Sequence, residues 1–325
     1  MPLSPDIDIP DGWCQSARRI ARAGFRRVLV LGASGRGKST YCSWLCRTLE
    51  GRRVAFVDAD IGQKDVGPSA SVTLAYPQPG QALADATLAA LHFVGAVNPM
   101  GHFLSLVTAT RDLADRAEAD VVVVDTTGLV QGPGRALKDQ LIHAVRPDLL
   151  IALQREDELE PLLQGNRHLP VLRLAVSPKA RSRSDRARRW AREERFRAYF
   201  RGAKSITLDL ERTVLREMPL FAGRQEWFPG AVWAERTAEG LVVVAPPGVV
   251  LPRKSRRLNP GFEVERLCGL GDQRDDTLGL GIVDAIDFAR RSVRVRTPVS
   301  AADICTLRFG ELLVHRDARH QRVPL

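Results

Sequence analysis

The chain has 325 residues, which is enough for two domains because a single hydrophobic core rarely grows beyond about 250–300 residues. Its hydrophobic content of 44% excludes a disordered protein, and no apolar run approaches the ~20 residues of a membrane-spanning helix. The net charge is +10, and twelve basic against three acidic residues between positions 173 and 204 account for nearly all of it.

The N-terminus opens with M-P-L-S-P-D-I-D-I-P, which lacks the charged-then-apolar order of a signal peptide. We therefore predict a cytoplasmic protein. Residues 1–24 are expected to form an N-terminal extension with a short helix near 17–22. The five cysteines include no C-x-x-C pair, so we expect neither a disulfide framework nor a zinc site.

The first predicted strand, near 27–31, leads into G-A-S-G-R-G-K-S at 32–39 and then into a helix that Gly51 ends. This strand–turn–helix context and the pattern G-x-x-x-x-G-K-[ST] are typical of a phosphate-binding loop. Glycines let backbone N–H groups point at phosphates, Lys38 reaches the β- and γ-phosphates, and Ser39 binds Mg²⁺. The predicted nucleotide-binding residues are Gly32, Ala33, Ser34, Gly35, Arg36, Gly37, Lys38, Ser39 and Thr40.

Strands and helices alternate up to about residue 205. Further strands are predicted at 53–57, 91–95, 121–124, 149–153 and 171–176, helices at 103–116, 135–144, 156–163 and 182–201, and loops at 67–80. Unbroken apolar runs such as V-V-V-V indicate strands buried on both faces of a parallel sheet. We therefore predict a doubly wound α/β domain of the P-loop NTPase type over 25–205. Short apolar runs broken by Gly and Pro predict a small β-rich domain over 206–325.

Acidic residues follow two of the predicted strands. Asp58 and Asp60 end the second strand, and Asp125 follows the four valines. Because one residue separates Asp58 from Asp60, an extended backbone would point both side chains the same way. Ligands of a parallel sheet bind at the carboxyl ends of its strands, so these carboxylates are expected beside the phosphate loop. Asp125 is the expected Walker-B-type residue, holding Mg²⁺ directly or through water. One member of the Asp58/Asp60 pair would order Mg²⁺ waters and the other would accept a proton. Alternatively, the pair only caps a loop.

The basic segment is predicted to form one helix over 182–201. Arg188, Arg192 and Arg195 fall at i, i+4 and i+7, which places them on a single face. We interpret the segment as an anion-binding element, with a solvated basic helix as the alternative. The histidines have no partner spacing and are expected to be structural.

The ordered motifs of this chain resemble one family. They are G-A-S-G-R-G-K-S-T, D-A-D-I-G-Q, F-V-G-A-V-N-P-M-G, D-T-T-G-L-V-Q-G-P-G and R-R-W-A-R-E-E-R-F-R-A-Y-F. Together they resemble the polynucleotide 5′-hydroxyl kinases, which include the kinase subunit of the pre-mRNA cleavage machinery and the pre-ribosomal-RNA-processing kinases. The resemblance covers roughly 25–205 and continues more weakly at T-L-G-L-G-I-V-D-A-I-D-F. It implies transfer of the ATP γ-phosphoryl group, with Mg²⁺, to the 5′-hydroxyl of a single-stranded or end-exposed nucleic acid, either RNA or DNA, with RNA favoured.

The resemblance also implies roles for individual residues. The implied catalytic residues are Lys38, Asp58, Asp60 and the lid arginines Arg192, Arg195 and Arg197, and the implied metal-linked residues are Ser39, Asp58 and Asp125. The acceptor end is expected to contact Gln63, Asn98, Pro99, Gly101, Thr127, Gly128 and Leu129.

The chain departs from the family pattern in two places. Members of the cleavage-machinery type carry Trp at the position of Leu129, where the ring is expected to stack on a base. Leu129 is therefore expected either to contact the acceptor or to fill the core under its loop. Those members also have an N-terminal β domain that helps to bind adenine, whereas 31 residues precede Gly32 here. The preference between ATP and GTP is therefore left open.

Two other functions fit parts of the pattern. D-T-T-G resembles the switch segment of signal-recognition-type GTPases, so the chain would be a nucleotide-driven switch or assembly factor without a nucleic-acid acceptor. A nucleic-acid-binding module with a regulatory phosphate loop is the third hypothesis. The acidic pair and the lid arginines favour the kinase.

Overall fold

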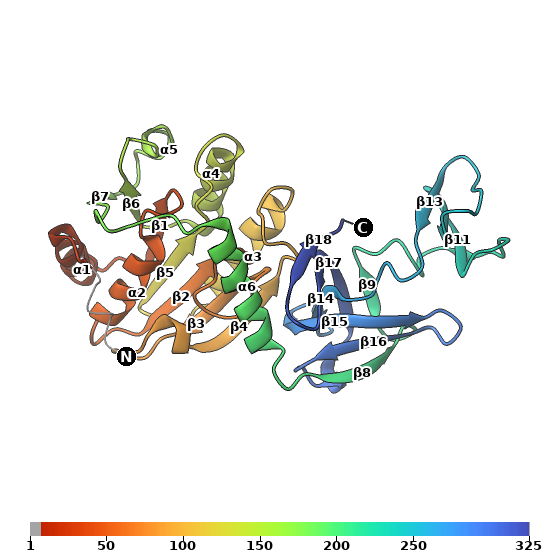
Figure 1. Ribbon diagram of the computed structural model, residues 1–325. Helices are drawn as coiled ribbons and strands as arrows, with labels where there is room; N and C mark the ends of the chain where they lie inside the picture. Colours follow the sequence, from red (N-terminus) through yellow and green to blue (C-terminus); the bar gives the residue numbers. More distant parts are fainter. Residues whose placement is uncertain (1–7, 325) are drawn as a thin grey trace. The chain divides into compact units, whose positions relative to one another are not determined.

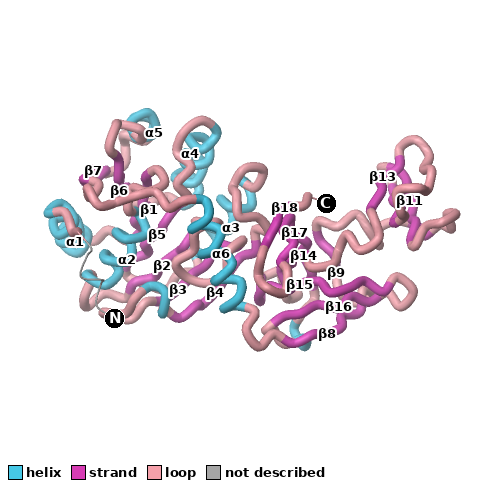
Figure 2. The backbone as a smooth tube through the Cα atoms, viewed as in Figure 1, coloured by secondary structure: helices cyan, strands magenta, loops and turns pink. Residues whose placement is uncertain are grey.

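The computed structural model describes residues 8–324 (Figures 1 and 2), so the first seven residues of the predicted N-terminal extension lie outside it. The chain divides into two compact units, one ending at Phe196 and the other beginning at Arg197. The first unit combines helices with a sheet, and the second consists mainly of strands (Figure 2). In the described part of the chain, no helix is both long and apolar enough to cross a membrane.

The first unit is built around a seven-stranded sheet. Its strands are β1 (Arg27–Gly32), β2 (Val54–Ala59), β3 (Ser71–Tyr76), β4 (Thr87–Phe93), β5 (Val121–Thr126), β6 (Leu149–Gln154) and β7 (Val171–Ala175). They lie in the order β4-β3-β2-β5-β1-β6-β7. The five strands from β2 to β7 in that order are parallel, whereas β3 pairs antiparallel with both β2 and β4.

Strand β3 corrects one prediction, because the sequence pattern predicts only loops over 67–80. Its residues 71–75 are buried, and a short 3₁₀ helix (Leu83–Asp85) precedes β4. Pro68 and Pro77 flank the strand closely, and turn residues on both sides concealed a run of only six residues.

Helices cover both faces of this sheet. They are α1 (Asp11–Ala23), α2 (Lys38–Thr48), α3 (Phe103–Asp115), α4 (Pro133–Val145) and α5 (Glu160–Gly165). A further helix, α6 (Asp185–Tyr199), follows β7 in the chain. Side chains of α3, α4 and α5 pack in the core on one face, and side chains of α1 and α2 pack in the core on the other. Helix α1 corresponds to the helix predicted near 17–22 and is longer than predicted. Helix α5 corresponds to the predicted acidic helix and begins at Glu160 instead of Glu156. The predicted α/β class is confirmed.

The second unit consists mainly of strands, which confirms the predicted β-rich domain. Its strands are β8 (Lys204–Asp209), β9 (Val214–Arg216), β10 (Arg224–Gln225), β11 (Trp233–Thr237), β12 (Gly240–Val244), β13 (Ser255–Leu258), β14 (Arg266–Gly271), β15 (Thr277–Asp287), β16 (Ser292–Thr297), β17 (Thr306–Val314) and β18 (His320–Arg322), with a 3₁₀ helix at Ala301–Asp303. One sheet has the order β18-β17-β14-β15-β16-β8 with β9 beside β17, and the other has the order β10-β11-β12-β13. Both sheets contribute to one apolar core.

The sheet register of the first unit brings the predicted motifs to one edge. Asp58 on β2 is paired with Asp125 on β5, and Val30 on β1 is paired with the same Asp125. The loop after β1 therefore lies beside the ends of β5 and β2. This edge, at the carboxyl ends of parallel strands, is where the phosphate loop and the acidic motifs meet.

Candidate active site

The phosphate loop bends in a way that requires glycine at two positions. Gly35 and Gly37 have φ angles of +74° and +82°, in the left-handed region that residues with a Cβ rarely adopt. A Cβ on Gly35 would also lie 2.5 Å from the backbone N of Ser182, so the loop closely approaches the segment that leads to α6. Helix α2 begins directly after Gly37, so its N-terminal end faces the loop.

A cavity of about 140 Å³ lies over this loop. Its walls come from the loop itself, from the segments after β2 and β5, and from the start of the basic segment. The residues outside the phosphate loop are Asp60, Gln63, Asp65, Gly128, Arg181, Arg183 and Arg188. The structure thus brings four sequence motifs together around one cavity that is large enough for phosphate groups: the phosphate loop, D-A-D-I-G-Q, D-T-T-G and the arginine-rich segment.

Three residues of the loop lie outside this lining. Gly32 ends β1, where a Cβ would lie 2.7 Å from the Leu153 carbonyl oxygen. The Ala33 carbonyl accepts a hydrogen bond from Lys38 Nζ at 3.2 Å. The Arg36 guanidinium is bound by Glu158 at 2.6 Å, so its charge is already paired.

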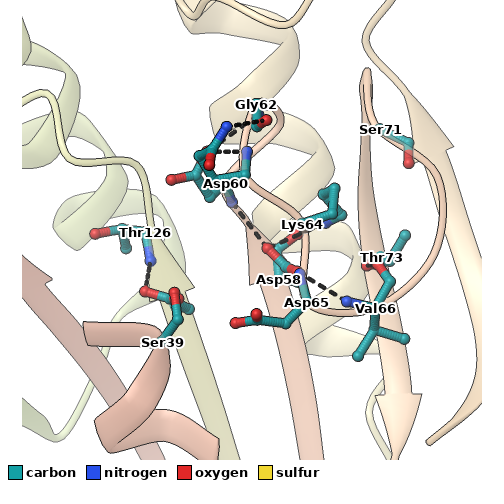
Figure 3. Close-up of polar contacts among 12 residues, drawn as sticks. Ser39, Asp58, Asp60, Gly62, Lys64, Asp65, Val66, Ser71, Thr73 and Thr126 are labelled. Carbon is teal, nitrogen blue, oxygen red and sulfur yellow. Dashed lines mark hydrogen bonds and ion pairs between the residues drawn. The ribbon is translucent and has the colours of Figure 1, made fainter. Parts of the chain in front are cut away.

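Ser39 and Asp125 form the predicted pair. The Ser39 hydroxyl donates to Asp125 Oδ2 at 2.7 Å, and the Thr126 N–H donates to Oδ1 at 2.8 Å (Figure 3). Burial raises the pKa of Asp125 to about 7; the Lys38 charge opposes this shift, and the Asp58 and Asp65 charges add to it. A nearby cation would therefore stabilise the charged form of this buried carboxylate, which is what a site for nucleotide-bound Mg²⁺ requires.

The two carboxylates of D-A-D do not point the same way, which corrects the expectation for Asp58. Its Oδ1 forms an ion pair with the fully buried Lys64 at 3.1 Å, and its Oδ2 accepts from the N–H groups of Asp65 and Val66 (Figure 3). Asp58 is 1% exposed and does not line the cavity. The strand ends at Ala59, so the alternation that would align the two side chains stops there. Asp58 fixes the loop 60–66, and no oxygen is left over for a metal.

Asp60 is the member of the pair that faces the cavity. Its Oδ1 accepts hydrogen bonds from the N–H groups of Gly62 and Gln63, both at 3.0 Å, and the described residues offer its Oδ2 no hydrogen bond. Burial raises its pKa, Lys38 lowers it and Asp58 raises it further. One oxygen is held and the other is available to a reacting group.

Asp65 is a site residue that the sequence analysis did not select. Its carboxylate points back toward Ser39 (Figure 3), and its buried Oδ2 has no hydrogen-bond partner. Burial and the Asp58 charge raise its pKa to about 6, while Arg195 opposes that shift. The signal was weak, because a lone Asp five residues past D-A-D matches no spacing rule.

We predict that Asp58→Asn lowers the free energy of unfolding by about 3–5 kcal/mol, because it leaves the Lys64 ammonium buried without a counter-charge. Denaturant melts of the protein without nucleotide would measure this. The control is Asp120→Asn, which alters the exposed pair between Arg53 and Asp120 and should cost less than about 1 kcal/mol. A variant as stable as the wild type would return Asp58 to the list of chemical residues.

The basic helix meets the cavity with a different arginine from those selected. Arg188 donates to the Ser34 hydroxyl at 3.0 Å and to the Ser182 hydroxyl at 2.6 Å, and it lines the cavity. Arg195 donates to the Asp65 carbonyl at 2.6 Å, and Arg192 does not line the cavity. Arg197 belongs to the second unit and donates to the Asp317 carbonyl at 3.1 Å, so the structure gives no support for its lid role.

The predicted acceptor residues do not all face the cavity: Gln63 and Gly128 line it, whereas Thr127 is buried and does not. The Asn98 side chain accepts from the Met100 N–H, and the neighbouring Val97 carbonyl packs against Gly62, where a Cβ would lie 2.6 Å away. This places the loop containing Asn98, Pro99 and Gly101 beside the D-A-D segment but outside the cavity lining. Gly128 lines the cavity and is so close to Ser34 that a Cβ would lie 2.7 Å from its N.

Leu129 packs into the core and not into the cavity. It is half-buried against the apolar cluster under α3 and α4, and a Cβ on Gly134 would lie 2.5 Å from its Cγ. Of the two expectations for Leu129, this packing favours the structural one.

The oxygen donors beside the phosphate loop suit a metal ion that nucleotide phosphates also hold. Among the described residues, no three His, Cys, Asp or Glu side chains converge to hold a metal ion. Mg²⁺ in nucleotide sites is held by one or two protein oxygens together with phosphates and water, so Ser39 and Asp125 fit that requirement.

The fold and the cavity together define a P-loop nucleotide-binding protein. The family model of the mRNA cleavage and polyadenylation factor CLP1 P-loop matches residues 32–202, more than half of the chain. The chain is 33% identical to a polyribonucleotide 5′-hydroxyl-kinase of Pyrococcus furiosus over 95% of its own length and 94% of the relative's. It is 31% identical to one of Methanocaldococcus jannaschii over 89% and 87%. The chain therefore belongs to the CLP1-type polyribonucleotide 5′-hydroxyl-kinase family.

The fold is also similar to a solved structure. Clp1p, in a complex with Pcf11p, superimposes with a TM-score of 0.62 at 13% sequence identity, covering 91% of this chain and 76% of that one. At this identity the similarity concerns the fold alone.

Proposed function

We propose that this kinase transfers the γ-phosphoryl group of ATP to the 5′-hydroxyl of RNA. The observation that carries the proposal is the cavity, where Lys38, the uncommitted oxygen of Asp60 and the Arg188 guanidinium surround one space next to the phosphate loop. A phosphoryl donor, a proton acceptor and a charge-stabilising cation are the parts that this reaction needs. The printed names of the two archaeal relatives support RNA as the acceptor.

Each residue would contribute a separate step. The loop N–H groups and Lys38 hold the β- and γ-phosphates, and Arg188 neutralises charge on the transferring group. Asp60 accepts the proton of the 5′-hydroxyl, and its raised pKa lies closer to neutral pH, where a general base works best. Ser39 and Asp125 would hold Mg²⁺, which supplies charge neutralisation between the phosphates.

The acceptor would approach from the side of Gln63 and Gly128. Both line the cavity, and Gln63 is tied to Gly62 through its side-chain amide at 2.9 Å. The exposed arginines at 181 and 183 lie on the same cavity wall and would attract an RNA backbone. A single-stranded or end-exposed strand fits this arrangement, because its terminal hydroxyl must reach Asp60.

The test is a transfer assay with labelled ATP. Wild-type protein would be incubated with matched RNA and DNA strands carrying a 5′-hydroxyl, and with the same strands carrying a 5′-phosphate as controls. We expect label on the 5′-hydroxyl RNA and none on the blocked strands. Hydrolysis of ATP without label on any strand would contradict the proposal and favour a nucleotide-driven switch.

We predict that Asp60→Asn lowers kcat by about 10²–10⁴, the usual contribution of a general base, and leaves ATP binding nearly unchanged. Asn keeps the acceptor that Gly62 and Gln63 use, so the loop should stay folded. Single-turnover rates and the Kd for ATP would be measured together. Wild-type turnover in the variant would remove Asp60 from the mechanism.

A further inference from the structure

A buried lysine on α4 has no role in the mechanism described so far. Lys138 is 0% exposed, and its Nζ donates to the Thr127 hydroxyl oxygen at 2.8 Å. No described carboxylate forms an ion pair with it. Burying an ammonium that only a hydroxyl accepts is costly, so a purely structural position would favour an apolar side chain such as Leu.

The partner of Lys138 belongs to the D-T-T-G segment, which is held at three successive side chains. Asp125 accepts from Ser39 at 2.7 Å, and the Thr126 hydroxyl donates to the Val30 carbonyl at 2.8 Å. Thr127 is the third, and its anchor is α4. Gly128 follows directly and lies against Ser34 at the cavity wall. Each of these three hydrogen bonds therefore restricts the position of Gly128 at the cavity wall, where an RNA acceptor would arrive.

The amino group of Lys138 also lies within electrostatic reach of the reacting groups. Burial lowers its pKa to about 7, the Lys38 charge lowers it further, and the charges of Asp60 and Asp125 oppose the shift. Lys138 does not line the cavity, and its geometric link to the site is the hydrogen bond to Thr127.

The hydrogen bond between Lys138 and Thr127 fixes the end of the D-T-T-G segment. The Lys138 Nζ donates and the Thr127 hydroxyl oxygen accepts, and Thr127 itself is 4% exposed and does not line the cavity. Gly128, the next residue, does line it. We propose that Lys138 is a positioning residue, which holds Thr127 so that Gly128 stays at the cavity wall where the acceptor's terminal nucleotide would bind. This inference rests on the proposed function, because it requires a nucleic-acid acceptor.

The experiment is a double-mutant cycle on the full-length protein. Lys138→Met keeps the volume but removes the donor, Thr127→Val removes the hydroxyl, and the double variant removes both. For each, the KM for a short 5′-hydroxyl RNA, the KM for ATP, kcat and the melting temperature would be measured. The control is Arg135→Met, which removes one positive charge from the exposed side of the same helix.

We expect each single variant to raise the KM for RNA roughly tenfold, because loss of the hydrogen bond between Lys138 and Thr127 leaves Gly128 less firmly placed at the cavity wall, with the KM for ATP unchanged. The double variant should be no worse than either single one, and Thr127→Ser, which restores the hydroxyl, should recover the RNA affinity. Arg135→Met should behave like the wild type.

Additive effects would overturn the inference, because Lys138 would then act on Asp60 through its charge. A wild-type KM for RNA in Thr127→Val would also overturn it, and this result does not depend on whether Lys138→Met folds. Failure of the proposed function looks different, because the wild-type protein would then label no RNA at all.

Discussion

Lys38→Ala should bring phosphoryl transfer below detection, a loss of at least about 10³. The Lys38 ammonium is 7% exposed and donates to the Ala33 carbonyl at 3.2 Å, which keeps it over the loop. It would be the charge closest to the β- and γ-phosphates, and no other residue of the loop replaces it, because Arg36 is paired with Glu158. Positioning and charge neutralisation would be lost together.

The same substitution should change the melting temperature little. Lys38 makes one hydrogen bond within the loop, and the carboxylates near it already have raised pKa values, so they can take up protons when the ammonium is lost. Labelled-ATP transfer and thermal melts without nucleotide would be measured on the same preparation. Arg36→Ala is the matched control, and its transfer rate should fall far less. A large loss of stability in Lys38→Ala would show that Lys38 supports the fold.

The phosphate loop could be predicted from sequence because its constraints are local. Three glycines, Lys38 and the Ser39 hydroxyl lie within eight residues between a strand and a helix. The positions of most strands and helices of the first unit along the chain followed from apolar periodicity for the same reason. In that unit β3 was missed, where prolines flank a short strand.

The acidic motif shows where local rules stop. Alternation predicts parallel side chains at positions 58 and 60 only while the backbone stays extended. The strand ends between them, and Lys64 folds back to Asp58 from six residues further on. That contact depends on the path of a loop. For the same reason the sequence gives only a weak signal for Asp65, and the place of Lys138 follows only from its contact with Thr127.

The basic helix shows a related limit. The spacing predicted one arginine face, and the face exists, but spacing along a helix cannot tell which turn lies over the phosphate loop. Contacts with Ser34 and Ser182 place Arg188 there, one turn before the arginine that the resemblance selected. The position of the helix along its axis is set by the close approach of Gly35 to Ser182.

Arg188→Ala is therefore expected to lower the transfer rate by about 10³–10⁵, the contribution of an arginine that neutralises transition-state charge in phosphoryl transfer. The guanidinium contacts Ser34 in the phosphate loop, so it is the lid cation placed closest to a transferring group. Binding of ATP alone should weaken much less, since charge on the transferring group is rearranged mainly in the transition state. Single-turnover transfer and the Kd for ATP would separate the two effects.

Two further substitutions make this prediction specific to one turn of α6. Arg189→Ala removes an arginine paired with Glu193 at 3.2 Å, which does not line the cavity, and should leave the transfer rate nearly unchanged. Arg192→Ala tests the residue that the family resemblance selected, and we expect its effect to be smaller than that of Arg188→Ala because Arg192 lies outside the cavity lining. A larger loss in Arg192→Ala would mean that the helix shifts by one turn when nucleotide binds. If Arg188→Ala changed only the salt dependence of RNA binding, α6 would hold the RNA backbone and would not act on the phosphoryl group.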